Sequence, residues 1–335
     1  MAKMTFGLRL PTYVWENEAA SLDVLCSFGE RAEQLGFECL WVVDHLLIAR
    51  PSYLSSFHDP LVVLSALASR TTRIRLGTAI LVLPLRPAAI VAKEFATLDS
   101  LSNGRLEFGV GVGWHEAEFT SVGVPISERG RRTDEYLEVL RRLWTGDSVS
   151  FQGKFLSFED IQILPRPAQR PHPPIWIAGG SVLPPVFSAD RGYAYRQFRG
   201  GEPSYEAVYR RIARSDGWMA TAMATPELMR QDWAEVCRYA AEYGRDPKKI
   251  RRAQTSMMMV TDDVEGAKAI FGRFTGKALD EWAMKATYLI GSADQIAERI
   301  AERAEIGIDH MILTPVTFDV DQLDVWASKV LSRFR

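Results

Sequence analysis

The sequence predicts an α/β fold in which eight parallel strands close into a (β/α)8 barrel, the TIM barrel. Short apolar segments alternate with longer segments whose apolar residues recur every three or four positions, as on one face of a helix. Eight such apolar segments follow one another along 335 residues. Eight parallel strands are the number that closes a (β/α) barrel. An open, doubly wound sheet is the competing architecture, but it has no reason to stop at eight strands.

The apolar segments are expected to be buried strands, since runs such as LWVV and AILVL are apolar on both faces of a sheet. In chain order the expected strands span residues 4–10, 37–43, 74–83, 105–112, 174–178, 218–220, 252–260 and 308–314.

Helices are expected between the strands, and several carry signals at their ends. Gly36 follows the first helix, where a left-handed C-cap is favoured. Asp59–Pro60 and Thr225–Pro226 each combine an N-cap with a first-turn proline, and Ser292 with Gln295 forms a capping box. The expected helices span about 22–35, 59–69, 87–101, 128–144, 225–244, 292–307 and 320–334.

Three stretches interrupt the alternation and are interpreted as insertions into a single domain of residues 1–335. They follow strands four, five and seven and span about 148–173, 182–204 and 262–290. Segments after a strand's carboxyl end border the mouth of a barrel, where ligands bind. The second stretch carries Arg196 and Arg199, which could bind an anion within a substrate lid; it could equally be a packing or dimer element.

Composition excludes several classes of protein. The 40 Lys and Arg balance 42 Asp and Glu, which argues against a nucleic-acid partner. No apolar run approaches the roughly 20 residues that span a bilayer, and the amino terminus lacks the apolar core of a signal peptide. Three cysteines without a CxxC pair do not form a disulfide framework. We therefore expect a cytoplasmic protein without a membrane partner.

Most short catalytic motifs are absent. The GxGxG run that begins at Gly109 has Trp114 where a dinucleotide fingerprint needs glycine, and Ala278 stands where a phosphate loop needs Ser or Thr. The segment that starts at His115 begins like the HExxH motif of zinc proteases, but Phe119 occupies the position of the second histidine. Five histidines are dispersed along the chain, so no metal site is predicted.

Polar and small residues instead gather where strands end. Asp44 and His45 follow the second strand, residues 113–116 the fourth, and residues 178–181 the fifth, while residues 78–80 lie within the third. These ends share the catalytic face of a barrel. Taken singly, Asp44 could be a carboxylate that fixes a loop, and the Gly179–Gly180 pair could be only a tight turn.

Several segments, in order along nearly the whole chain, resemble the bacterial luciferase-like flavin-dependent oxidoreductases. They are residues 41–46, 74–78, 92–99, 104–114, 173–180, 216–218, 291–295 and 304–310. The resemblance is specific for the family and much less specific for the reaction. It implies a TIM barrel with insertions that uses a reduced flavin: FMN in monooxygenases, or the deazaflavin coenzyme F-420 in dehydrogenases and reductases.

The resemblance also implies positions for the cofactor. Asp44 and His45 would lie beside the flavin ring, and a non-proline cis peptide at Ala79–Ile80 would lie behind it. Gly113 and Trp114 would border the ribityl chain or the substrate, and a turn of small residues would receive the phosphate. The candidate cofactor-binding residues are Asp44, His45, Thr78, Ala79, Ile80, Gly113, Trp114, Ala178, Gly179, Gly180 and Ser181.

His45 is the first candidate to donate or accept a proton, because the pKa of an imidazole lies near neutrality, and His115 is the second. A monooxygenase also needs an apolar pocket that excludes water. Its expected walls, which could equally be ordinary core, are Trp15, Phe57, Trp114 and Tyr195.

The leading hypothesis is an FMNH2-dependent monooxygenase of a small organic substrate. A separate reductase would supply the flavin, since no second flavin-reducing domain fits this length. The alternative is an F-420-dependent dehydrogenase or reductase, whose polyglutamate tail would want a basic track at Arg129, Arg131 and Arg132, although these could simply be a solvated helix start.

Two hypotheses from different classes of protein also stand: a non-catalytic flavin-binding protein, and a metal-dependent hydrolase on the same barrel. One departure bears on an F-420-dependent enzyme, because sugar-phosphate dehydrogenases of that branch carry an acid where this chain has Trp114. The resemblance also implies a homodimer.

Overall fold

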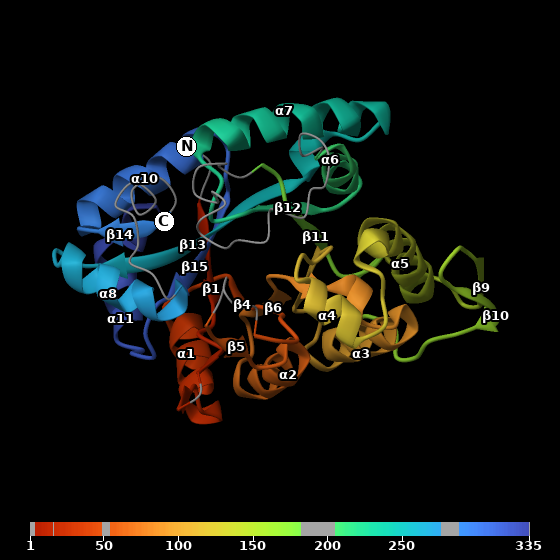
Figure 1. Ribbon diagram of the computed structural model, residues 1–335, viewed down its shortest axis with the longest axis horizontal. Helices are drawn as coiled ribbons and strands as arrows, with labels where there is room; N and C mark the ends of the chain where they lie inside the picture. Colours follow the sequence, from red (N-terminus) through yellow and green to blue (C-terminus); the bar gives the residue numbers. More distant parts are fainter. Residues whose placement is uncertain (1–3, 16, 49–53, 182–204, 276–287, 335) are drawn as a thin grey trace.

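The computed structural model describes residues 4–15, 17–48, 54–181, 205–275 and 288–334, and its strands form the predicted barrel (Figure 1). Neighbouring barrel strands are parallel; β8 pairs with β11 and β15 pairs with β1, so the sheet closes on itself. The eight strands of the barrel are β1 (Thr5–Arg9), β4 (Cys39–Val42), β6 (Arg75–Thr78), β8 (Leu106–Gly111), β11 (Ile175–Ala178), β12 (Gly217–Ala220), β13 (Arg251–Val260) and β15 (His310–Pro315).

Helices cover the outside of the barrel, and their apolar faces pack against the outward-facing side chains of the strands in one large core. They are α1 (Leu22–Gln34), α2 (Pro60–Arg70), α3 (Ala88–Leu101), α5 (Arg129–Thr145), α6 (Glu206–Ala213), α7 (Pro226–Glu242), α10 (Ala293–Glu305) and α11 (Gln322–Lys329). None of the helices in the described part of the chain is long and apolar enough to cross a bilayer.

The four predicted helix-capping signals are confirmed, whereas the last helix, expected over 320–334, ends at Lys329 and is followed by a 3-10 turn. Gly36 follows α1 with a φ of 76°, a left-handed conformation that glycine adopts without steric cost. The side chains of Asp59 and Thr225 accept hydrogen bonds from the first amides of α2 and α7. Ser292 and Gln295 form both hydrogen bonds of the capping box at α10.

The inside of the barrel is filled by large side chains. Trp41 and Trp176 are each 1% exposed, and their rings meet edge to face at 5.8 Å. Glycines on the neighbouring strands make room for them: a Cβ at Gly77 would lie 2.4 Å from Trp41, and one at Gly217 would lie 2.1 Å from Trp176. Because real atoms do not approach so closely, only glycine fits at these two positions.

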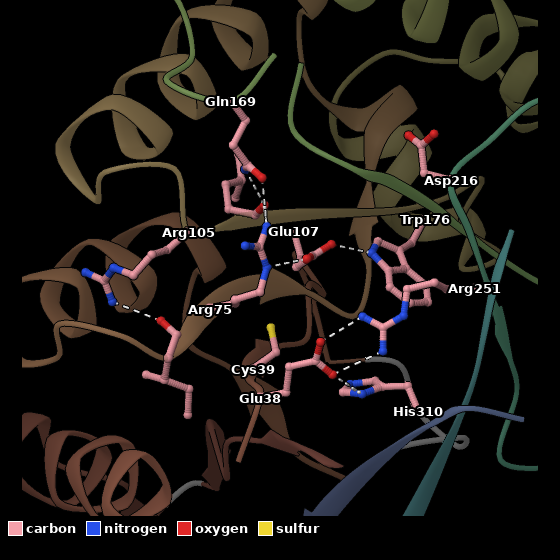
Figure 2. A network of polar contacts seen from close by, with 12 residues as sticks. Glu38, Cys39, Arg75, Arg105, Glu107, Gln169, Trp176, Asp216, Arg251 and His310 are labelled. Carbon is pink, nitrogen blue, oxygen red and sulfur yellow. Dashed lines mark hydrogen bonds and ion pairs between the residues drawn. The ribbon is translucent and has the colours of Figure 1, made fainter. Parts of the chain in front are cut away.

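A polar network closes the amino-terminal end of the barrel, and we call it the floor (Figure 2). Glu38 accepts hydrogen bonds from Arg251 at 2.9 and 3.1 Å and lies 3.1 Å from Nδ1 of His310. Trp41 donates from Nε1 to Nε2 of His310 at 3.1 Å. Burial works against the charged form of Glu38, but His310 and Arg251 outweigh it and hold the pKa of this carboxyl well below its usual range.

A second carboxylate extends the floor toward β8 and β11. The Glu107 side chain is 6% exposed and accepts hydrogen bonds from Trp176 Nε1 at 2.6 Å and from Arg75 Nε. Arg75 also donates to Gln169 at 2.8 Å. Figure 2 shows Glu107 between Arg75 and Trp176, and Glu38 between Cys39 and His310. Both carboxylates therefore have charged and neutral donors.

The structure differs from the expected elements in several places. The expected third strand, 74–83, is divided into β6 and β7 (Leu81–Val82) by a break at residues 79–80. The stretch 148–173 contains the antiparallel hairpin β9 (Val149–Gln152) and β10 (Ser157–Ile161), which projects beyond α5 in Figure 1. The stretch 182–204, with Arg196 and Arg199, lies outside the described residues.

The stretch 262–290, interpreted as an insertion, contains regular secondary structure. It contains α8 (Val264–Thr275) and β14 (Leu289–Gly291), which pairs with β13. Ala267, Ile270 and Phe271 are spaced so that they share one face of α8, and Ala267 and Phe271 are buried. This apolar face explains why the segment is helical despite Gly266 and Gly272.

Short elements at the mouth were not expected. They are α4 (Glu116–Ser121) and the small sheet formed by β2 (Tyr13–Trp15), β3 (Glu18–Ala19) and β5 (Ser56–Phe57). Single 3-10 turns span Leu83–Leu85, Ile126–Glu128, Pro247–Lys249 and Leu331–Phe334.

Candidate functional site at the carboxyl ends of the strands

The carboxyl ends of β4 and β6 are joined by backbone hydrogen bonds. The amide of Ala79 donates to Val42 O at 2.8 Å, and the amide of Asp44 donates to Ile80 O at 3.2 Å. The peptide bond between Ala79 and Ile80 is cis, as the resemblance implied. These contacts bring the candidate residues after β4 next to those of the third strand, and we call this end of the barrel the rim.

Asp44 is buried and fixes the loops of the rim. It accepts hydrogen bonds from the Val82 amide at 3.0 Å and from Arg86 at 3.1 Å. Arg86 also donates to Asp59, the N-cap of α2, at 2.8 Å. Burial raises the pKa of Asp44, and the Arg86 charge and the Val82 amide oppose this rise only in part. The contacts of Asp44 are therefore those of a carboxylate that holds strand ends together.

His45 is positioned by a buried glutamate that the sequence reasoning missed. Its Nδ1 lies 3.1 Å from Oε1 of Glu118, in α4, and the amides of Leu46 and Leu47 donate to the same oxygen at 2.8 and 3.2 Å. Burial works against a charged Glu118, but the contacts with His45 and the amides lower its pKa overall. A carboxylate accepts but does not donate, so Nδ1 of His45 carries the hydrogen.

His115 approaches the other oxygen of the same carboxylate. Its Nδ1 lies 4.0 Å from Oε2 of Glu118, which is too far for a hydrogen bond. His115 Nδ1 and Glu118 Oε2 are both buried, and neither has a hydrogen-bond partner among the described residues. Glu118 therefore lies between both candidate catalytic histidines but is bonded to His45 alone.

Aromatic rings continue from His45 across the mouth. Its ring centroid lies 5.6 Å from that of Trp114 and 5.5 Å from that of Phe57. Further ring contacts, with centroids 5.5 to 5.8 Å apart, join Phe57 to Tyr13, Tyr13 to Trp15, and Trp15 to Phe318. Three of the four expected wall residues thus share one aromatic surface; the fourth, Tyr195, lies outside the described residues.

Thr78 and Gly113 contribute to the packing of the rim. The Thr78 hydroxyl donates to Gly109 O at 2.7 Å and accepts from the Gly109 amide at 3.1 Å, so it joins β6 to β8. Gly113 has a φ of 75°, and a Cβ there would lie 2.5 Å from Val82. The backbone next to Trp114 therefore takes a course that a larger residue would not allow.

The small-residue turn after β11 faces a carboxylate. Beyond Ala178, Gly179 and Gly180 have φ values of 140° and 123°. The amide of Ser181 then donates to Asp232, in α7, at 2.8 Å, and its hydroxyl donates to the other oxygen of Asp232 at 2.6 Å. The donors that the resemblance assigns to a phosphate are thus directed at a buried acid.

Several polar atoms at the rim, including those of His115 and Glu118 just described, are buried without a hydrogen-bond partner among the described residues. They belong to Thr12, His115, Glu118, Thr221 and Thr314, all near the carboxyl ends of barrel strands. Buried polar atoms are nearly always paired in native proteins, so such a group suits a ligand with a polar edge. Nowhere in the described ranges do three or more His, Cys, Asp or Glu side chains gather in a way that could hold a metal ion.

Sequence reasoning missed Glu118, Arg86, Tyr209 and Asp232. Glu118 follows His115 by three residues, the spacing of neighbours on one helical face, and this was the available signal. Asp232 is 51 residues from Ser181, and Tyr209 is 28 residues from it, so no local pattern connects them.

Comparisons with known proteins identify the family of this chain. Residues 4–186 match the family model described as luciferase-like monooxygenase. An FMNH2-dependent dimethylsulfone monooxygenase of Pseudomonas putida is 30% identical over 330 residues, covering 91% of this chain and 85% of the relative. An F-420-dependent glucose-6-phosphate dehydrogenase of Amycolatopsis mediterranei is 38% identical, over 48% of each chain.

The fold is shared with solved structures as well. A monooxygenase from Streptomyces bottropensis superimposes with a TM-score of 0.80 at 24% identity, over 99% of this chain and 100% of the other. The family match covers more than half of the chain, and the dimethylsulfone monooxygenase aligns with nearly all of it. The chain therefore belongs to the luciferase-like monooxygenase family of flavin-dependent oxidoreductases.

Proposed function

We propose that the protein is an FMNH2-dependent monooxygenase that acts on a small, uncharged organic substrate and receives reduced flavin from a separate reductase. The observation that carries this proposal is the similarity to the dimethylsulfone monooxygenase along 91% of the chain. The F-420-dependent relative, in contrast, aligns with only 48% of it. The chemistry of the rim supports the same choice.

The residues at the rim suit the ring of a flavin. Ala79–Ile80, His45 and Trp114 lie near one another at the rim, and the same end of the barrel carries buried polar atoms without partners among the described residues. Bound reduced FMN supplies the electrons and activates dioxygen. The protein supplies position, an apolar wall and a proton-handling group.

His45 is the residue that we expect to move a proton. In its neutral form, with Nδ1–H bonded to Glu118, the lone pair lies on Nε2; this nitrogen can accept a proton and, once protonated, can donate it. Glu118 stabilises the ring orientation and the charged form of the imidazole. His115 is the second candidate, because its Nδ1 faces the same carboxylate at 4.0 Å.

The aromatic surface supports an uncharged substrate. Trp15, Phe57 and Phe318 exclude water from the mouth, and Met257 and Met259 pack against the same group. The nearby cation, Arg273, stacks 5.0 Å from the Trp15 ring and pairs with Glu18. An apolar, water-excluding wall of this kind favours oxygenation over unproductive side reactions.

The second candidate, an F-420-dependent dehydrogenase or reductase, is favoured by the 38% identity to the glucose-6-phosphate dehydrogenase. The proposed basic track for its tail is weakened by internal contacts. Arg132 pairs with Glu128 at 2.7 Å and stacks on Phe155, and Arg129 donates to Ile126 O at 2.9 Å. In addition, this chain has Trp114 at the position where the sugar-phosphate dehydrogenases of that branch carry an acid.

The test is an anaerobic titration of the purified protein with reduced FMN and, separately, with reduced F-420. It is followed by turnover of dimethyl sulfone with and without dioxygen labelled with oxygen-18. The proposal expects binding of reduced FMN and labelled oxygen in the product. Hydride transfer to or from F-420 without dioxygen would establish the second candidate instead, and flavin binding without turnover of any substrate would indicate a non-catalytic flavin-binding protein.

A further inference from the structure

Asp232 is a buried acid that faces the turn after β11. From described residues its side chain accepts three hydrogen bonds: from the Ser181 amide at 2.8 Å, the Ser181 hydroxyl at 2.6 Å and the Tyr209 hydroxyl at 2.5 Å. The residue is 1% exposed. Such an arrangement, with amide and hydroxyl donors around one anion, is the kind that binds a phosphate.

The turn is shaped to admit this carboxylate. Gly180 has a φ of 123°, and a Cβ at this position would lie 2.5 Å from Oδ2 of Asp232. Burial, together with the hydrogen bond to Asp232, raises the pKa of Tyr209, so its hydroxyl keeps its proton and remains a donor. Glycine at position 180 therefore allows Asp232 to reach the donors of Ser181.

Within the described ranges of the chain Asp232 has no Lys or Arg partner, and the groups there that stabilise its negative charge are the hydrogen-bond donors of Ser181 and Tyr209. A phosphate at the same donors would compete for them and would be repelled by the carboxylate. With the carboxylate in place, Ser181 directs its amide and hydroxyl hydrogens at Asp232, so they do not face a ligand.

We infer that Asp232 is an internal occupant of the phosphate subsite, which the phosphate of FMN displaces, and that this exchange keeps flavin binding reversible. The inference rests on the proposed function. When the flavin leaves, Asp232 satisfies the partly buried donors of Ser181 and Tyr209, which would otherwise lose a protein partner. A monooxygenase that takes reduced FMN from a reductase must release oxidised FMN at each turnover, so weak phosphate binding suits it.

The test compares FMN with riboflavin, which lacks only the phosphate. Dissociation constants for both oxidised flavins would be measured by fluorescence quenching on the wild-type chain and on Asp232→Asn, which has the same shape without the charge. We expect Asp232→Asn to bind FMN about tenfold or more tightly, with slower FMN release, because a charged hydrogen-bond partner is gained. Riboflavin binding should change by less than about twofold, since no phosphate is involved.

Ser181→Ala is the matched control, because it removes a donor that both Asp232 and the phosphate use. In the Asp232→Asn background it should reverse most of the gain for FMN and leave riboflavin unaffected. Should Asp232→Asn fail to fold, Asp232→Ser removes the charge with a smaller side chain and carries the same expectation.

Two results would overturn the inference. If Asp232→Asn binds FMN no more tightly than the wild type does, or if both flavins change equally, Asp232 does not compete with the phosphate, although the proposed function stands. If neither flavin, oxidised or reduced, binds the wild type or the variant, the proposed function fails and the inference fails with it.

Discussion

The two ends of the barrel use the same kinds of side chain in opposite ways. At the floor, Glu38 and Glu107 are each bonded to an arginine and to an aromatic or imidazole N–H. At the rim, one oxygen of Glu118 is bonded to His45 and two amides, while the other has no hydrogen-bond partner among the described residues. Paired groups stabilise the fold, whereas unpaired buried groups suit a ligand.

This contrast follows from the geometry of a parallel barrel. The amino ends of the strands meet at the floor, and the carboxyl ends meet at the rim, where catalytic groups of such barrels lie. Substitutions at the floor should therefore reduce stability and spare the activity of the folded protein. Substitution of the proton-handling histidine at the rim should reduce activity and leave stability nearly unchanged.

His45→Ala should have the largest effect and should lower turnover by a factor of roughly 10² to 10⁴, because it removes the proton-handling group. Turnover would be measured with saturating reduced FMN and dimethyl sulfone. His172→Ala is the matched control, since its ring contacts Pro173 O and Trp144 away from the rim, and its turnover should equal that of the wild type. An unchanged rate in His45→Ala would remove this residue from the mechanism.

Glu107→Leu should lower the free energy of unfolding by about 1–3 kcal/mol, because it leaves the buried Trp176 N–H without its acceptor and removes the carboxylate beside the partly buried Arg75. Urea denaturation measures this change, and turnover of the folded variant should stay within about twofold of the wild type. Glu138→Ala, which breaks an exposed ion pair with Arg142, should cost no more than about 1 kcal/mol. Equal costs for both variants would contradict the role of the floor.

Glu118→Gln should change the pH dependence of turnover and should have little effect on the fold. A glutamine oxygen can still accept from the amides of Leu46 and Leu47, but the negative charge beside His45 is lost. Removal of a nearby negative charge disfavours the positively charged form of a proton-handling group, so the limb of the pH profile that reports this group should move to lower pH. Turnover measured across a series of pH values would show this shift; an identical profile in both proteins would show that Glu118 does not act on His45.

The smallest expected effect is the acid sensitivity of the floor. Because the folded-state pKa of Glu38 is lowered, its contribution to stability is complete above the unfolded-state value of about 4.3 and is lost as pH falls through the lower folded-state value. Unfolding by urea at several pH values should show wild-type stability falling below about pH 4, with a flatter dependence in Glu38→Gln. Parallel curves for the two proteins would contradict this assignment.

Much of the fold was predictable because its signals are local. Buried parallel strands are continuous apolar runs, and helix ends carry caps such as Ser292 with Gln295, so eight strands and most helices could be placed from the residues alone. The stretch 262–290 was interpreted only as an insertion, and helix α8 within it was not predicted; its conformation follows from the apolar face of Ala267 and Phe271.

The site was predictable only in part. The strand ends at Asp44, His45 and Trp114 follow from the barrel, and their joint role with Ala79–Ile80 came from the family resemblance. The contacts of Glu118 and Asp232 depend on how α4 and α7 pack on the barrel, which periodicity does not encode. Cofactor assignments at the candidate residues therefore stay predictions, as do a homodimer and a cytoplasmic location.

Hydrogen–deuterium exchange with and without reduced FMN, under anaerobic conditions, tests most directly whether the rim holds the flavin. We expect slower exchange in peptides that contain residues 44–47 and 113–119 when reduced FMN is saturating. Peptides from the outer surface between α5 and α6 should be unaffected. Protection confined to that outer surface, or equal exchange at the rim with and without reduced FMN, would contradict the account.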